Sequence, residues 1–244
     1  MVLEGIQHNR KKGQKSLAVL IDPDHSDLPG LVERARLAKQ SGVDYLFLGG
    51  SLVMGNETNE VAVTLKQHCD LPVILFPGSP MQICSEVDAV LFLSLISGRN
   101  PDYLIGNQVI AAPYIKKLGI ETLPTGYMLV ASDRETTATY ISQTKPLPPH
   151  KPEIAAATAM AGEMLGLRML YLDMGSGASN PVPSALISSV RKSVDIPLIV
   201  GGGIRTAEQL EEVYQAGADV AVVGNAIEHD HALIEELGAV KWNF

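Results

Sequence analysis

The chain alternates short apolar segments with longer amphipathic ones, and this alternation constrains its fold more than any other feature. Eight of the short segments are apolar almost throughout, as expected of parallel strands that are buried on both faces. They are Leu17–Ile21, Tyr45–Leu48, Val73–Phe76, Ala89–Leu93, Thr122–Val130, Met169–Asp173, Leu198–Val200 and Val220–Val223. Eight such strands with helical segments between them predict an α/β fold, a closed (β/α)8 TIM barrel. Barrels of this length are commonly single domains, so residues 1–244 are expected to form one TIM-barrel domain.

Capping signals indicate where several outer helices begin and end. The segment Thr206–Gln209 matches a capping box, in which the threonine hydroxyl and the glutamine side chain each bind a free backbone N–H. Asn100-Pro101 and Asn180-Pro181 each predict an N-cap followed by proline at the first helical position. Gly42 and Gly217 are predicted to follow the ends of two helices.

Two connections depart from the regular pattern. Only twelve residues separate Phe76 from Ala89, and a helix with both of its loops barely fits in that length. The third outer helix is therefore expected to be short or missing, which would leave a gap in the ring of helices. The segment Ser142–Pro152 contains four prolines and predicts an ordered loop after the fifth strand.

Charge and cysteine content exclude several classes of protein. The chain has 19 Lys+Arg against 27 Asp+Glu and a net charge of −8, so it lacks the basic surface of a nucleic-acid binder. Its apolar N-terminal stretch is too short for a signal peptide, and its longest uncharged segment is too rich in Gly, Ser and Pro to span a membrane. Cys69 and Cys84 match neither a metal site nor a disulfide scaffold. A cytoplasmic protein without a transmembrane segment is expected.

Glycines follow three neighbouring strands at the end where TIM barrels carry their active sites. Gly175 and Gly177 come after the sixth strand, Gly201–Gly203 after the seventh, and Gly224 after the eighth. Glycine-rich loops let backbone N–H groups approach an anion, and helix N-termini add a positive dipole. Single glycines also serve as tight turns, but three adjacent clusters favour a phosphate site.

Carboxylates end the first and sixth strands. Asp22 and Asp24 suit Mg²⁺, which takes one or two carboxylates together with waters and substrate phosphates, although turn chemistry explains an Asp-Pro-Asp segment equally well. Asp173 is either a salt-bridge partner or a group that binds or deprotonates a hydroxyl. Tyr171 lies two residues earlier and therefore on the same side of that strand.

Four motifs carry a resemblance to a known family. They are Leu20-Ile-Asp-Pro-Asp24, Gly49-Gly-Ser51, Tyr171-Leu-Asp-Met-Gly-Ser-Gly-Ala178 and Gly201-Gly-Gly-Ile-Arg205. In this order and spacing, the chain resembles the geranylgeranylglyceryl phosphate synthases, a family that includes bacterial heptaprenylglyceryl phosphate synthases. The resemblance implies a Mg²⁺-dependent prenyltransferase. Such an enzyme joins the 3-hydroxyl of sn-glycerol 1-phosphate to a polyprenyl diphosphate, here geranylgeranyl diphosphate, and releases diphosphate.

The resemblance also implies roles for individual residues. Asp22 and Ser51 would hold the Mg²⁺ that carries the diphosphate, and Asp173 and Tyr171 would act in catalysis. The residues implied to bind glycerol 1-phosphate are Tyr171, Asp173, Met174, Gly175, Ser176, Gly177, Gly202, Gly203, Gly224 and Asn225. The prenyl chain would lie in a groove where the third outer helix is missing, in agreement with the short connection after Phe76.

Two positions depart from the family pattern. Asp173 stands where many members have Glu, and His25 stands where they have Lys. The shorter carboxylate lies about one methylene further back, so action through a water is an alternative to direct deprotonation. Tyr103 resembles the bulky aromatic residue that limits prenyl length near the bottom of the groove in the family, and an ordinary packed helix residue is the alternative.

The sequence alone leaves other functions and the oligomeric state open. A heptaprenylglyceryl phosphate synthase, a metal-independent phosphate-sugar isomerase or synthase, and a non-catalytic polyprenyl-phosphate binding protein are the alternatives. A homo-oligomer is expected. The apolar segment Tyr103–Ile115 would provide either the self-contacting face or buried core.

Overall fold

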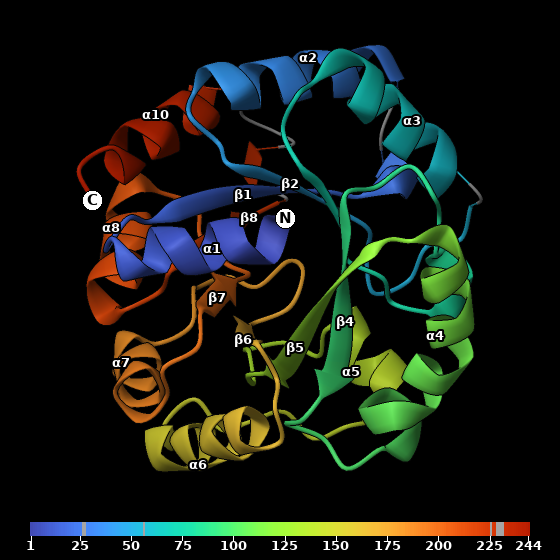
Figure 1. Ribbon diagram of the computed structural model, residues 1–244. Helices are drawn as coiled ribbons and strands as arrows, with labels where there is room; N and C mark the ends of the chain where they lie inside the picture. The colour runs from blue at the N-terminus through green and yellow to red at the C-terminus, as the bar shows by residue number, and fades with distance from the viewer. Residues whose placement is uncertain (26–27, 56, 225, 228–231) are drawn as a thin grey trace.

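Eight parallel strands form a closed barrel in the computed structural model, which describes residues 1–25, 28–55, 57–224, 226–227 and 232–244 (Figure 1). Each strand pairs with the next, and β8 pairs with β1 to close the sheet. The strands are β1 (Ser16–Ile21), β2 (Tyr45–Leu48), β3 (Val73–Leu75), β4 (Ala89–Leu95), β5 (Glu121–Leu129), β6 (Met169–Asp173), β7 (Leu198–Gly201) and β8 (Val220–Val223). The predicted TIM barrel and its eight strands are confirmed.

In the described part of the chain, an outer helix follows each strand except β3. They are α1 (Val2–Lys11), α2 (Leu28–Gln40), α3 (Thr58–His68), α4 (Asn107–Leu118), α5 (Thr137–Ser142), α6 (Pro152–Met164), α7 (Ser184–Ser193), α8 (Ala207–Ala216) and α10 (Ala232–Lys241), with 3-10 turns η1 (Pro23–His25) and η2 (Pro80–Gln82) and a π-helical turn η3 (Asp102–Gly106). Only η2 connects β3 to β4, so the third outer helix is missing, as predicted. Among the described residues, no helix is long and apolar enough to cross a bilayer.

Helix α1 lies across the N-terminal end of the barrel (Figure 1). Its Ile6 is 2% exposed and packs with the side chains that fill the barrel interior. At the start of β5, the Glu121 carboxylate accepts hydrogen bonds from the backbone N–H groups of Val2 (2.7 Å) and Leu3 (3.0 Å). A carboxylate at a helix N-terminus stabilises the helix by capping and by its interaction with the helix dipole. The barrel is thus closed at this end, and its open mouth lies at the C-terminal ends of the strands.

Most of the predicted caps are present. Thr206 accepts a hydrogen bond from the N–H of Gln209, whose own side chain accepts one from the N–H of Arg205. Gly217 ends α8 in the left-handed conformation, with φ at +117°. Asn100 accepts a hydrogen bond from the N–H of Asp102 at the start of η3.

The prediction that a helix begins at Asn180-Pro181 is wrong. Helix α7 begins at Ser184, directly after Pro183, and no side chain caps it. Proline disfavours the helical conformation in the residue that precedes it. Pro183 therefore keeps Val182 out of the helix, and residues 181–183 have no regular secondary structure.

The proline-rich segment between α5 and α6 is ordered, as predicted. Leu147 is buried and bridges to Val130 at the end of β5. Its N–H donates to the carbonyl of Leu129, and its carbonyl accepts from the N–H of Ala131, both at 2.8 Å. These bonds hold the loop against the mouth of the barrel.

Strand β4 is much longer than its neighbour β3. The two strands pair at only two positions, Ile74 with Ala89 and Leu75 with Val90, whereas β4 pairs with β5 along its whole length. The segment Leu91–Leu95 therefore has no β3 partner. The side-chain amide of Gln108 in α4 donates a hydrogen bond to the carbonyl of Leu93, within the part of β4 that has no β3 partner.

Candidate functional site

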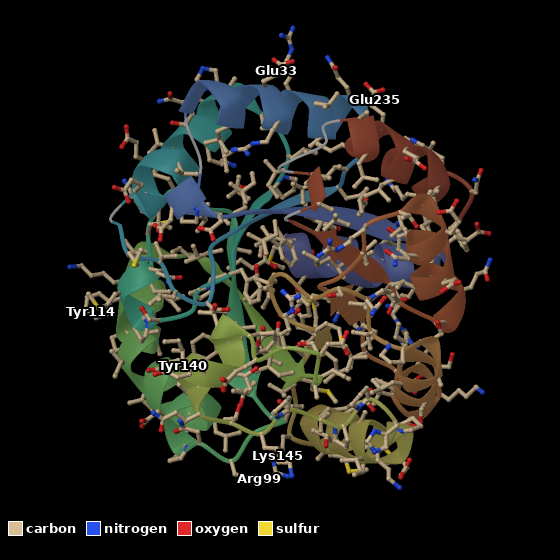
Figure 2. The ribbon with its side chains drawn as sticks, turned by 180° about the vertical axis from the view of Figure 1, so that it is seen from behind. Glu33, Arg99, Tyr114, Tyr140, Lys145 and Glu235 are labelled. Carbon is tan, nitrogen blue, oxygen red and sulfur yellow. The ribbon has the colours of Figure 1, made fainter. Side chains whose placement is uncertain are left out.

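The loops after β6, β7 and β8 begin side by side at the mouth of the barrel, which faces the viewer in Figure 2. Asp173 pairs with Gly201 across β6 and β7, and Gly201 pairs with Val222 across β7 and β8. Because parallel strands end at the same edge, this register brings three glycine-containing loops together. The sequence prediction that these loops form one cluster is confirmed for the described residues.

Asp173 lies at the centre of this cluster and is only 6% exposed. Its Oδ2 accepts a hydrogen bond from the Tyr127 hydroxyl at 2.5 Å, and its Oδ1 accepts one from the N–H of Gly175 at 2.8 Å. Burial raises the pKa of Asp173, and these two hydrogen bonds oppose part of that rise. The result is a fixed carboxylate that binds a proton more tightly than an exposed aspartate does.

Three aromatic rings line the interior below Asp173. The ring of Tyr171 lies 5.5 Å from that of Tyr127 and 5.3 Å from that of Phe76, between ring centres. Burial and the neighbouring Asp173 raise the pKa of both tyrosines well above the usual value, so both hydroxyls stay protonated. Tyr171 and Asp173 lie on the same side of β6, as predicted.

Sequence reasoning missed Tyr127, although a signal was present. Tyr127 lies at every-second-residue spacing from Leu123, Thr125 and Leu129, so all four share the inward face of β5. A buried tyrosine hydroxyl needs a hydrogen-bond partner, and the inward alternation indicates that this partner lies inside the barrel.

Gly202 and Gly203 allow the loops after β6 and β7 to touch through their backbones. Both have φ at +78°, a conformation that side-chain-bearing residues rarely adopt. A Cβ on Gly202 would lie 2.9 Å from the carbonyl oxygen of Gly175 and 3.0 Å from Oδ1 of Asp173. A Cβ on Gly203 would lie 2.0 Å from the carbonyl oxygen of Asn180. Glycine at both positions is therefore needed to assemble this part of the mouth.

Of the other predicted phosphate-binding residues, some lie in the loops at the mouth and others do not. Gly177 and the exposed Ser176 lie in the loop after β6, and Gly224 lies beside Leu20 at the end of β8. The Met174 side chain is buried in the outer core, and its N–H donates to the carbonyl of Gly201. Both groups of Met174 are thus engaged within the protein. Asn225 lies outside the described residues.

The two carboxylates after β1 have different surroundings. Asp24 accepts hydrogen bonds from the backbone N–H groups of Met54 (2.7 Å) and Gly55 (3.2 Å), so it holds the loop after β2. Asp22 lies two residues beyond the inward-facing Leu20 and accepts the N–H of Asp24 on Oδ1. Its Oδ2 would lie 3.4 Å from a Cβ on Gly50, the residue before Ser51. Asp24 therefore shapes the loop, while Asp22 faces the mouth beside Ser51.

An apolar groove extends from the mouth through the opening beside β4. Ser51, Phe76 and Tyr127, which belong to the C-terminal ends of strands or follow them, line the groove together with Ile83, Val90 and Ile115. It occupies the space left by the missing third outer helix. Tyr127 belongs to both parts of the site, because its ring lines the groove and its hydroxyl binds Asp173.

Helix α4 and the preceding η3 form one wall of the groove. Tyr103 in η3 and Ile115 in α4 both line the groove. The inner side of α4 is buried, whereas its outer side exposes several large apolar residues, including Tyr114, which points away from the molecule in Figure 2. The segment Tyr103–Ile115 thus contains both buried core and an exposed apolar face.

The remaining predicted features near the metal position are described only in part. Among the described residues, no group of three or more His, Cys, Asp and Glu side chains could hold a metal ion. The side chain of His25 lies outside the described part of the chain.

Comparison with known proteins gives consistent matches over nearly the whole chain. The model of the PcrB family matches residues 9–241. The geranylgeranylglyceryl phosphate synthase of Spirosoma linguale is 52% identical over 232 residues, which cover 95% of this chain and 93% of the relative. That of Chitinophaga pinensis is 50% identical over 228 residues, covering 93% and 90%. The crystal structure of (S)-3-O-geranylgeranylglyceryl phosphate synthase from Thermoplasma acidophilum, in complex with its substrate sn-glycerol-1-phosphate, is 30% identical. It aligns with a TM-score of 0.95 and covers 100% of this chain and 99% of that one.

Proposed function

The chain belongs to the PcrB family, and on that premise we propose that it is a prenyltransferase that joins geranylgeranyl diphosphate to the 3-hydroxyl of sn-glycerol 1-phosphate. The observation that carries this proposal is the double role of Tyr127. Its ring lines the apolar groove, and its hydroxyl binds the carboxylate that lies among the glycine loops. A prenyl chain and a polar acceptor would therefore meet at one point.

The glycerol phosphate would bind on the β6–β8 side of the mouth. Backbone N–H groups of the loops that contain Gly177, Gly202 and Gly203 provide donors without adding charged side chains. Asp173 would accept the proton of the 3-hydroxyl, directly or through a water, because its raised pKa makes it a better base than an exposed aspartate. A fixed phosphate would orient the hydroxyl toward the groove.

The prenyl diphosphate would lie across the other side of the mouth. Its chain would enter the groove, and its C1 would lie near Phe76 and Tyr127. As the C1–oxygen bond breaks, positive charge builds on the allylic carbon, and the faces of these rings stabilise such charge. The glycerol 3-oxygen forms the new bond to C1, its proton passes to Asp173, and diphosphate leaves.

Asp22 and Ser51 fit a Mg²⁺ ion that arrives with the diphosphate. Mg²⁺ prefers oxygen ligands and typically takes only one or two carboxylates, with substrate phosphates and waters completing the shell. The absence of a Cβ on Gly50 lets the Asp22 carboxylate lie against the loop that carries Ser51. When bound, the ion would neutralise charge on the departing diphosphate.

Diphosphate release tests the proposed function. We expect the purified chain to release diphosphate when it receives geranylgeranyl diphosphate, sn-glycerol 1-phosphate and Mg²⁺ together. Omission of glycerol phosphate should abolish release, which separates transfer from hydrolysis. Full activity in excess chelator would contradict the Mg²⁺ proposal and favour a metal-independent enzyme on the same barrel. Binding of the prenyl substrate without any release would favour a binding protein.

Gly203→Ala is expected to weaken binding of sn-glycerol 1-phosphate by at least about tenfold, because the new Cβ would displace the loop at Asn180. Isothermal titration calorimetry measures the change. Gly166→Ala is the matched control, since Gly166 also has a positive φ, +91°, but no atom lies within 4 Å of its added Cβ. Equal loss of binding in both variants would show that backbone strain alone is responsible.

Tyr103→Ala is expected to raise turnover of heptaprenyl diphosphate relative to geranylgeranyl diphosphate, because removal of the ring leaves more room in the groove for a longer chain. Competition assays with the two diphosphates measure the ratio. Tyr140→Ala serves as the control, since Tyr140 is 69% exposed and is not among the residues that line the groove. An unchanged ratio in Tyr103→Ala would mean that Tyr103 is an ordinary packing residue.

We also propose that the chain forms a homo-oligomer through the outer face of α4. Val109, Ile110 and Tyr114 are 65%, 58% and 64% exposed on this helix. Val109→Glu is expected to lower the molar mass measured by light scattering to that of one chain, and an unchanged mass would contradict this assignment. The cytoplasm is the proposed compartment, in keeping with the free thiols of Cys69 and Cys84.

A further inference from the structure

We propose that an apolar rim beside the groove, formed by Leu52, Met54 and Met81, docks the protein on the surface of a lipid bilayer. The prenyl chain of the substrate would then pass from the bilayer into the groove without crossing water. This inference rests on the proposed function, because it assumes a prenyl diphosphate as the substrate. It concerns a surface of the molecule that binds neither of the reacting groups.

The three rim side chains are strongly exposed and uncharged. Leu52, Met54 and Met81 are 50%, 85% and 94% exposed. They belong to residues 51–55 and 77–83, which contain no Asp, Glu, Lys or Arg, whereas 19% of the whole chain is charged. The ionised groups beside these segments are Asp24, which is bound by the N–H groups of Met54 and Gly55, and Glu57, whose carboxylate lies against Gly55. The apolar side chains themselves can enter a bilayer without the cost of removing water from a charge.

The rim side chains project from loops with a fixed backbone. Asp24 binds the N–H of Met54, and the Ser79 hydroxyl accepts the N–H of Met81 at 3.3 Å. The Gln82 side chain accepts the N–H of Gly78 at 2.8 Å. These bonds fix both loops in a conformation that turns the apolar side chains outward.

The two loops are in contact with each other. A Cβ on Gly78 would lie 2.5 Å from the carbonyl oxygen of Gly50 and 2.6 Å from that of Ser51. The loop after β2 and the connection after β3 therefore form one continuous surface.

The rim is also continuous with the prenyl groove. Ser51, Pro80 and Ile83 line the groove, while their neighbours Leu52 and Met81 point into solvent. Adjacent residues thus belong alternately to the groove and to the rim. A prenyl chain that leaves the groove on this side would meet these apolar side chains.

The chemistry of the substrate favours a bilayer as the occupant of the rim. Each buried methylene of a lipid chain adds to its retention in a membrane, so a twenty-carbon prenyl chain resides there rather than in water. Because the rim lacks cations and the chain has a net charge of −8, binding is expected to depend on apolar contact. It should be insensitive to salt on zwitterionic lipid and weaker on anionic lipid.

Vesicle flotation with the full chain tests the proposal. We expect the wild type to float with phosphatidylcholine vesicles, and we expect Met54→Glu/Met81→Glu to reduce the partition coefficient by about tenfold. Met164→Glu is the matched control, because Met164 is an 84% exposed methionine at the end of α6. Failure of the wild type to float, or an equal loss in the control, would overturn the proposal. A lower molar mass of the double variant, with unchanged flotation, would assign the rim to contact with a second copy.

Activity measured in two formats separates this inference from the proposed function. The double variant is expected to match the wild type with detergent-dispersed geranylgeranyl diphosphate and to lose kcat/KM when the substrate is embedded in vesicles. Equal loss in both formats, or no loss in either, would contradict docking through the rim. Absence of transfer by the wild type in both formats would contradict the proposed function, while flotation would still report on docking.

Discussion

Asp173→Asn is expected to lower kcat by about 10²- to 10⁴-fold while leaving the affinity for sn-glycerol 1-phosphate nearly unchanged. The carboxamide has the shape of the carboxylate and preserves its surroundings. Its oxygen can accept the N–H of Gly175, and its amino group can donate to the Tyr127 hydroxyl. What it loses is the ability to accept a proton, so steady-state kinetics and calorimetry should show the two effects separately.

The same substitution should raise stability at neutral pH. Burial raises the pKa of Asp173 above its ordinary value of 3.8, so the folded state binds the proton more tightly than the unfolded state. The contribution of Asp173 to stability therefore falls as pH rises from that ordinary value through the raised one. Asparagine does not titrate, so Asp173→Asn should unfold at an equal or higher temperature than the wild type at pH 8, with less advantage at pH 5.

Two outcomes would remove Asp173 from the proposed mechanism. One is wild-type kcat in Asp173→Asn. The other is wild-type turnover that stays constant as pH falls toward the ordinary range of a carboxyl group, because a general base loses activity when it is protonated. Asp173→Glu is the informative partner variant, since it keeps the base and extends it by one methylene.

Asp22→Asn is expected to reduce Mg²⁺-dependent turnover by at least about a hundredfold, because loss of charge at the proposed metal ligand would weaken stabilisation of the departing diphosphate by several kcal/mol. The fold should be unaffected, since the carboxamide oxygen can still accept the N–H of Asp24. Calorimetric binding of diphosphate with and without Mg²⁺ gives a readout that does not depend on turnover. The variant should lose the part of the affinity that requires the ion.

Asp24→Ala provides the contrast for Asp22. This variant removes the acceptor for the N–H groups of Met54 and Gly55, so its main expected effect is a lower unfolding temperature. Retention of Mg²⁺-dependent diphosphate binding by Asp22→Asn, together with its loss in Asp24→Ala, would reverse the two assignments.

The sequence predicted the strands well because each is apolar along its length, and this property can be recognised without knowledge of the tertiary structure. It also predicted the missing outer helix, because the length between Phe76 and Ala89 limits what that connection can contain. It failed at Asn180, where a local capping signal was overridden by Pro183 two residues beyond the expected start.

Local sequence patterns could not predict features that depend on contacts between distant segments of the chain. Tyr127 meets Asp173 across 46 residues of sequence, and only the register of β5 with β6 brings them together. Likewise, Asp22 and Asp24 are alike in sequence and differ only in what the neighbouring loop presents to them. Where β3 ends relative to β4 is also set by tertiary packing.

The early end of β3 has a consequence for the integrity of the sheet itself. The segment Leu91–Leu95 is locally an edge strand inside a barrel, and unprotected edges are templates for pairing with another chain. Helix α4 covers this edge, and the Gln108 amide occupies the carbonyl of Leu93. The segment of β4 beside the groove is therefore an open sheet edge that α4 and Gln108 protect from pairing with another chain.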